Sequence, residues 1–102
     1  MLSAKRKEHT VLQAETIGAV VAVSLRVDTG VPKFPQSEIR IGQYGAEGDF
    51  HAGPINKHKK AGPPEPNHRQ LTVVAREVLD AVNERLGTDL GPGSIGENVL
   101  VE

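Results

Sequence analysis

The chain has 102 residues and a formal net charge of -1, from twelve basic and thirteen acidic side chains. A chain of this length forms one domain at most and buries only about two-thirds of the surface that it exposes when unfolded. The balanced charge gives no overall field for gripping nucleic acid or an anionic membrane, so neither is an expected partner and any anion site must be local. There is no cysteine, which excludes disulfides, thiolate metal ligands and thiol nucleophiles on this polypeptide.

The N-terminal region carries no targeting or membrane signal. The longest apolar run, at residues 19–23, is far too short to span a bilayer, and residues 1–10 lack a hydrophobic signal region. The expected location is therefore the cytoplasm. Residues 1–16 are charged and have no sustained apolar period, which predicts a poorly ordered arm or loosely docked segment. A nucleic-acid tail around Lys5, Arg6 and Lys7 is the alternative, which the neutral remainder disfavours.

The domain itself is expected over residues 17–102. Residues 17–27 are mostly β-branched and apolar, which predicts a strand buried on both faces at its start. Prolines cannot donate to a sheet ladder, so the two prolines within residues 28–37 predict a loop there. Isoleucines on either side of Arg40 predict a short amphipathic strand at residues 39–41.

The C-terminal half begins with residues 42–69, which are rich in Gly, Pro, His and Lys and predict a long functional or mobile loop. Residues 70–74 predict a buried strand. A helical spacing of apolar residues predicts an amphipathic helix at about residues 75–86, ended by Gly87. A second glycine loop leads to a final strand at residues 98–101. One helix among four strands indicates a mainly β or α+β domain.

The segment from Tyr44 to His51 contains the most informative group of polar residues. Its glycines allow a sharp turn from which Asp49 and His51 project. Asp49 could orient His51 or accept a hydrogen bond from a substrate, and His51 could transfer a proton near neutral pH or bind phosphate as a cation. On residue types alone, a turn capped by Asp49 with an exposed His51 is favoured over a functional role.

Other polar groups are open to more than one interpretation. Asp49, His51, His58 and His68 could bind a divalent metal, but their gaps are irregular and lie in a loop broken by prolines. The basic run at residues 57–60 could hold a phosphate or be a solvated loop, and Arg69 is the stronger phosphate candidate because it precedes a predicted strand. Residues 93–98 form a turn that could offer backbone NH groups to an anion, without the lysine of a phosphate loop.

Three motifs occur in a recognisable order. A Val-rich strand ends in residues 30–33, a G-x-x-G-D-x-H pattern spans residues 45–51, and a G-x-x-G-E-N pattern spans residues 93–98. In sequence and spacing the chain resembles the MOSC family, named after the C-terminal domain of molybdenum cofactor sulfurase. The resemblance runs from about residue 17 to residue 102.

The resemblance implies a partial MOSC-like β-barrel and a pocket that in relatives binds the molybdenum cofactor, molybdopterin. It also implies a role as a sulfur carrier to that cofactor or in molybdenum-dependent reduction of N-hydroxylated compounds. Lysine and arginine would hold the cofactor phosphate, aspartate and histidine would handle protons, and the Glu-Asn pair would provide hydrogen bonds. The matching residues are Lys33, Gly48, Asp49, His51, Arg69, Glu97 and Asn98.

Two departures from the family pattern shape the expectation. Relatives continue for several strands beyond the G-E-N segment, and the cysteine that they place there is absent from this chain. Only a soft sulfur anion readily accepts sulfur and ligates molybdenum, so the chain alone is not expected to be a competent sulfur carrier. The expected open sheet edges would be covered by a second copy or by another chain, unless the sequence is a fragment.

Two alternative functions come from other classes. The chain could be a non-catalytic binding or assembly module, a reduced MOSC relative completed by oligomerisation, which predicts concentration-dependent association without a cofactor. It could instead be a metal-dependent hydrolase that uses His51, His58 and His68, which predicts stoichiometric zinc or iron in the purified protein.

Overall fold

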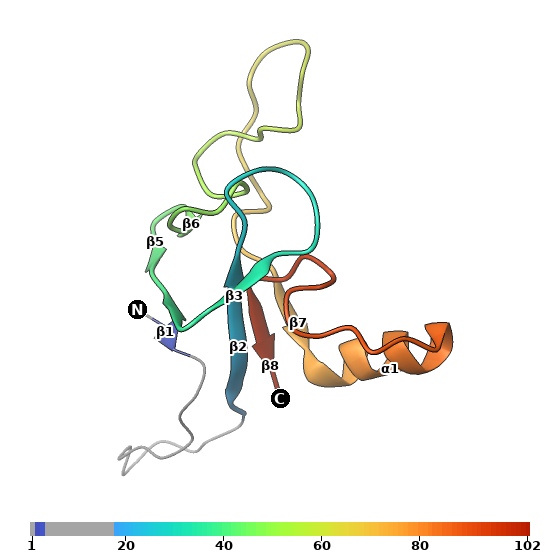
Figure 1. Ribbon diagram of the computed structural model, residues 1–102. Coiled ribbons are helices and arrows are strands. Elements are labelled where there is room, and N and C mark those ends of the chain that lie inside the picture. The colour runs from blue at the N-terminus through green and yellow to red at the C-terminus, as the bar shows by residue number, and fades with distance from the viewer. Residues whose placement is uncertain (1, 4–17) are drawn as a thin grey trace.

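The computed structural model describes residues 2–3 and 18–102. Apart from strand β1 (Leu2–Ser3), the predicted arm at residues 1–16 lies outside the described residues. Nine elements follow one another along the chain, eight short strands and the single helix α1 (Arg76–Leu86) within the part described (Figure 1). The prediction of a mainly β domain with one helix is confirmed.

Four strands form the central sheet in the order β3, β2, β8, β7 (Figure 1). Strand β2 (Val20–Leu25) pairs antiparallel with β3 (Phe34–Gln36) and with β8 (Val99–Val101). Strand β8 pairs parallel with β7 (Val73–Ala75), and α1 provides the crossover that a parallel pair requires. The described strands leave this sheet open, as expected of a partial barrel.

Two further pairs of very short strands lie beside the central sheet. Strand β4 (Glu38–Ile39) pairs antiparallel with β1, and β5 (Ile41–Gly42) pairs antiparallel with β6 (Gly45–Ala46). Figure 1 shows both pairs on the β3 side of β2. Strand β6 leads directly into the G-D-x-H segment at residues 48–51 and thus places it at one end of the central sheet.

The hydrophobic core joins all three sheets. Val23 and Val99 come from the central sheet, Ile39 from β4 and Ala46 from β6, and each is at most 4% exposed. Complete burial of a Val or Ile side chain contributes about 1.5–3 kcal/mol. This small aliphatic cluster therefore fixes the turn after β6 relative to the strands of the central sheet.

Helix α1 was predicted almost to the residue. It begins after Ala75 and ends at Leu86, and Gly87 has the left-handed conformation, with φ of 66°, that stops a helix. Its apolar face is less buried than the helical spacing predicted: Leu79 is buried, whereas Val78 and Leu86 are 48% and 64% exposed.

Several strand predictions need correction. The predicted loop at residues 28–37 contains β3. Pro35 is tolerated there because β3 is an outer strand of the described sheet, and a residue on its free side donates no hydrogen bond to a neighbouring strand. The strand predicted at residues 17–27 is described as Val20–Leu25, and its most buried residues are Val23 and Ser24 rather than its start.

The strands predicted at residues 39–41 and 70–74 also differ from the observed ones. The predicted strand at residues 39–41 is two strands broken at Arg40; Ile39 is buried but Ile41 is 40% exposed, since each pairs with a different partner. The strand predicted at residues 70–74 lies at Val73–Ala75, with Val73 54% exposed. The final strand is confirmed as β8, and the loop at residues 42–69 contains only β5, β6 and one isolated bridge.

In the part of the chain that the structure describes, no helix has the length and apolar character needed to cross a bilayer.

Candidate functional site

Asp49 lies at the centre of the turn that follows β6. Its backbone NH donates to the carbonyl of Ala46 at 3.0 Å, which closes the turn. Gly45 precedes this turn with φ of 107°, and a Cβ there would lie 2.2 Å from the carbonyl oxygen of Gln70. The G-x-x-G pattern therefore allows the turn to pack against the segment that enters β7.

The Asp49 carboxylate is buried and accepts three hydrogen bonds. Oδ1 accepts from the backbone NH of Arg26 at 3.0 Å, and Oδ2 accepts from Lys33 Nζ at 2.7 Å and from the backbone NH of His51 at 3.1 Å. The Lys33 and Asp49 side chains are 3% and 0% exposed. A buried ion pair of this kind persists only where hydrogen bonds satisfy the remaining lone pairs, as they do here.

Two opposing effects set the pKa of Asp49. Burial alone would raise the pKa of this carboxyl, because it disfavours the charged form. The hydrogen bond from Lys33, the backbone NH groups of Arg26 and His51, and the positive charge of Lys33 together outweigh burial and hold the pKa below its ordinary value. Asp49 is therefore a fixed anion that anchors Lys33.

His51 lies between this buried pair and the solvent. Its Nδ1 is 3.5 Å from Lys33 Nζ and 3.8 Å from Asp49 Oδ2, and its Nε2 is 2.9 Å from Nε2 of His58. Burial and the nearby Lys33 charge lower the pKa of His51, and the Asp49 charge opposes them only in part. The neutral imidazole, which can both accept and donate a hydrogen bond, is thus favoured.

The G-x-x-G-E-N turn packs directly on Lys33. The backbone NH of Lys33 donates to the carbonyl of Gly93 at 2.8 Å, and the NH of Gly93 donates to Glu97 Oε2 at 2.7 Å. Glu97 is 1% exposed, and its Oε1 has no hydrogen-bond partner among the described residues. The structure thus links Lys33 and Glu97, two predicted site residues, through Gly93.

Of the two remaining predicted site residues, Asn98 is buried and Arg69 is exposed. Asn98 is 1% exposed; its Nδ2 donates to the carbonyl of Ser24 at 3.0 Å and its Oδ1 accepts from the NH of Thr72 at 3.2 Å. It therefore joins β2 to the segment before β7. Arg69 is exposed, and within the described chain only its backbone NH has a partner, Asn67 Oδ1 at 3.0 Å.

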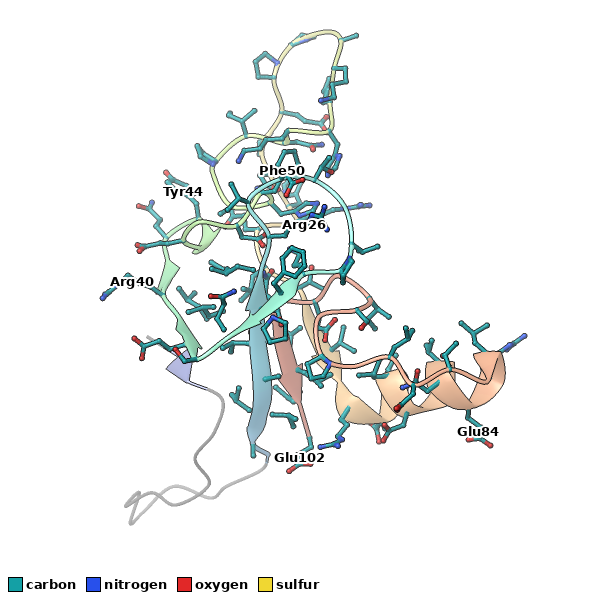
Figure 2. All side chains as sticks on the ribbon, viewed as in Figure 1. Arg26, Arg40, Tyr44, Phe50, Glu84 and Glu102 are labelled. Carbon is teal, nitrogen blue, oxygen red and sulfur yellow. The ribbon has the colours of Figure 1, made fainter. Side chains whose placement is uncertain are left out.

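Some contacts at the site were not predicted from sequence. The Asn67 amide donates to the carbonyl of His51 at 2.6 Å and so holds the ends of the long loop together. Gly48, by contrast, was a predicted site residue; it is exposed, with φ of 91°, directly before Asp49. The packing of Arg26 was also missed: its carbonyl accepts from the NH of Phe50 at 2.7 Å, and Figure 2 shows both residues together at one end of β2.

The long loop gives the site an excess of positive charge. Lys57 lies over the Phe50 ring at 5.1 Å, and Lys59 pairs with Glu65 at 3.5 Å. Lysine and arginine outnumber acids in residues 52–69 of this loop, with Lys57, Lys59, Lys60 and Arg69 against Glu65. No three side chains among the described residues are grouped so that they could hold a metal ion, and exposed His68 is not part of the His51–His58 contact.

The family model that matches this chain is the MOSC domain, over residues 47–102. The match covers more than half of the chain and includes Asp49, most of the long loop, α1 and the G-x-x-G-E-N turn. The chain belongs to the MOSC domain family.

The fold is also that of a solved structure, the YuaD protein from Bacillus subtilis. The two superpose with a TM-score of 0.71 at 20% sequence identity, over 83% of this chain. The aligned part covers 51% of the YuaD chain, so this chain spans about half of its length. None of the curated proteins compared with the chain matches it.

Proposed function

We propose that this chain binds the molybdenum cofactor at the Asp49 turn and takes part in sulfur transfer to the cofactor or in reduction that depends on it. The observation that carries the proposal is the buried Lys33–Asp49 ion pair with His51 directly beside it, under a loop with excess positive charge. A buried charged pair next to a polar rim is typical of functional sites. Membership of the MOSC family supports the choice of ligand.

The donor set fits a phosphorylated, anionic pterin. The exposed Arg69 guanidinium has no side-chain partner in the described chain, and a guanidinium can bind phosphate through two parallel hydrogen bonds. Lys57 adds a second cation on the same loop. Lys33 fits less simply, because Asp49 already balances its charge. We therefore assign phosphate binding to Arg69 and Lys57, and orientation of His51 to Lys33 with Asp49.

Each of these residues has a separate role in the proposed mechanism. A bound molybdenum cofactor would supply the metal and the dithiolene sulfurs at which the reaction takes place. Asp49 keeps Lys33 in place, and Lys33 directs its ammonium group at Nδ1 of His51. Neutral His51 can then take up or release a proton beside the bound group. Glu97 acts through its Oε2, which holds the Gly93 turn that packs on Lys33.

Retention of the pterin by purified variants tests the proposal. The protein is incubated with free molybdenum cofactor and desalted, and the bound pterin is quantified by fluorescence after oxidation. Arg69→Gln and Lys57→Gln should each reduce retention at least about 10-fold, because loss of a charged hydrogen bond costs about 1.5–3 kcal/mol. Arg85→Gln, in the last turn of α1, is the matched control and should retain the wild-type amount. Equal retention by all variants would contradict the assignment.

The second candidate is a non-catalytic assembly module. Strands β3 and β7 are the outer strands of the described central sheet, and Val73 of β7 is 54% exposed. An outer strand offers unpaired backbone groups to another chain, here a second copy. Size-exclusion chromatography with light scattering over a range of concentrations should then show a dimer that Val73→Lys dissociates. A monomer at all concentrations would contradict this candidate.

A further inference from the structure

The side chain of His58 contacts the site from the long loop, at a position that belongs to none of the three motifs. Its Nε2 is 2.9 Å from Nε2 of His51, and the two rings lie 5.0 Å apart between centroids and 34° from parallel. The Phe50 ring meets both imidazoles edge to face, at 5.4 Å from His51 and 5.6 Å from His58. The contact is therefore a packed cluster of three rings.

The loop that carries His58 is held by its own hydrogen bonds. Asn56 Oδ1 accepts from the backbone NH of His58 at 3.0 Å, and Asn56 Nδ2 donates to Glu65 Oε1 at 2.8 Å. A second tie joins the backbone NH of Asn67 to the carbonyl of Pro54 at 3.0 Å. His58 is thus placed by the local structure of the loop as well as by its contact with His51.

The neighbours of His51 determine which ring nitrogen carries its proton. A lysine ammonium can only donate, and Lys33 Nζ is closer to Nδ1 of His51 than Asp49 Oδ2 is, at 3.5 Å against 3.8 Å. Asp49 Oδ2 already accepts from Lys33 and from the His51 backbone. Nδ1 of neutral His51 is therefore the acceptor and its Nε2 carries the proton.

The tautomer of neutral His58 follows from that of His51. Because His51 Nε2–H donates, Nε2 of His58 must accept, which leaves the proton of neutral His58 on Nδ1. The hydrogen bonds run in one direction, from Lys33 to His51 to His58, and His58 is exposed to solvent.

We propose that His58 is a positioning residue that, together with Lys33, holds His51 in its Nε2–H tautomer and connects the buried end of the site to solvent as a proton relay. A proton that a bound ligand donates to Nδ1 of His51, in place of the hydrogen bond from Lys33, converts that ring to imidazolium. The Nε2 proton passes to Nε2 of His58, whose Nδ1–H passes to water. Each ring ends neutral in its other tautomer, and the reverse transfer restores the starting state. The use of this relay on a bound ligand rests on the proposed function; the tautomer and the coupling do not.

The charges around His51 predict how it titrates. Lys33, Asp49, Lys57 and His58 all face His51, and a positive charge on His58, 2.9 Å away, would oppose a second one on His51. His51 should therefore take up a proton at a higher pH when residue 58 cannot carry a charge.

The test is two-dimensional ¹H–¹⁵N NMR of the imidazole nitrogens of the ligand-free protein over a pH series. In the wild type, His51 should be the Nε2–H tautomer at high pH. His58→Gln keeps an acceptor but cannot be protonated, so it should preserve the tautomer and raise the pH at which His51 titrates. His58→Ala should raise that pH in the same way and also lower the share of the Nε2–H tautomer, because the acceptor for Nε2–H is lost. His68→Gln, another exposed loop histidine, is the control and should behave as wild type.

Two results would overturn the proposal: an Nδ1–H tautomer of His51 in the wild type, or a titration of His51 that is the same with and without His58. Neither result depends on cofactor binding. A coupled pair in a protein that retains no pterin would instead contradict the proposed function and leave the relay intact.

Discussion

Lys33 Nζ donates to Asp49 Oδ2 at 2.7 Å across sixteen residues of chain, with both side chains buried. This ion pair joins the segment before β3 to the turn after β6, and it brings His51 into contact with both groups. Removal of one member should therefore affect the fold and the site together.

Lys33→Met should destabilise the protein by about 3–5 kcal/mol, because it leaves the Asp49 carboxylate buried without its counter-ion. The double variant Lys33→Met with Asp49→Asn should lose less than Lys33→Met alone, since no buried charge then remains. Urea unfolding of the single and double variants measures the difference. Equal losses in the two would show that the pair is not coupled in the folded protein.

Acid should weaken the fold through Asp49. Its pKa is below the ordinary value in the folded protein, so the unfolded chain binds the proton first as the pH falls. The stability from this carboxylate is present above the unfolded pKa of about 4 and is lost as the pH falls through the folded pKa. The urea midpoint should drop between about pH 5 and about pH 2, and less steeply in Asp49→Asn. An identical slope in that variant would refute the assignment.

Asn98→Ala should cost stability at a residue that the family resemblance assigns to the cofactor. The substitution leaves the carbonyl of Ser24 and the NH of Thr72 without their side-chain partner, and each unsatisfied group costs about 1–3 kcal/mol. Chemical denaturation measures this loss. A change below about 0.5 kcal/mol would mean that Asn98 serves the ligand rather than the fold.

Gly93→Ala and Gly87→Ala form a matched pair of glycine substitutions with positive φ. A Cβ at Gly93 would lie 2.2 Å from the carbonyl oxygen of Lys33, whereas a Cβ at Gly87 meets nothing within 4 Å. Gly87→Ala should cost about 1–2 kcal/mol from its left-handed backbone alone. Gly93→Ala should cost about 1–3 kcal/mol more, because Lys33 must move. Similar thermal unfolding of the two variants would argue against close packing at Gly93.

The features that the sequence predicted best are those with a local cause. Helix α1 follows from apolar spacing and a glycine stop, and β8 follows from a short apolar run after a glycine loop. Strand β3 was missed because its pairing with β2 is non-local and an outer strand tolerates Pro35. The break at Arg40 was missed because β4 and β5 have different partners, which no local pattern encodes.

At the candidate site too, the features predicted from the sequence are those with a local pattern. The glycine spacing around Asp49 and Gly93 was visible in the sequence, and the family resemblance selected the residues that match its motifs. The contact between His51 and His58 was not predicted, because it depends on how residues 54–66 fold back over Phe50. The sixteen-residue separation of Lys33 from Asp49 likewise gave no local signal of an ion pair.

Native mass spectrometry of the protein after incubation with free molybdenum cofactor tests whether the Asp49 turn binds the cofactor. One added cofactor mass is expected on each wild-type chain, unchanged in Arg85→Gln and strongly reduced in Arg69→Gln. Wild-type protein that is folded, carries no added mass at any cofactor concentration used, and gives the same spectrum as Arg69→Gln would contradict the claim that the Asp49 turn is a cofactor site.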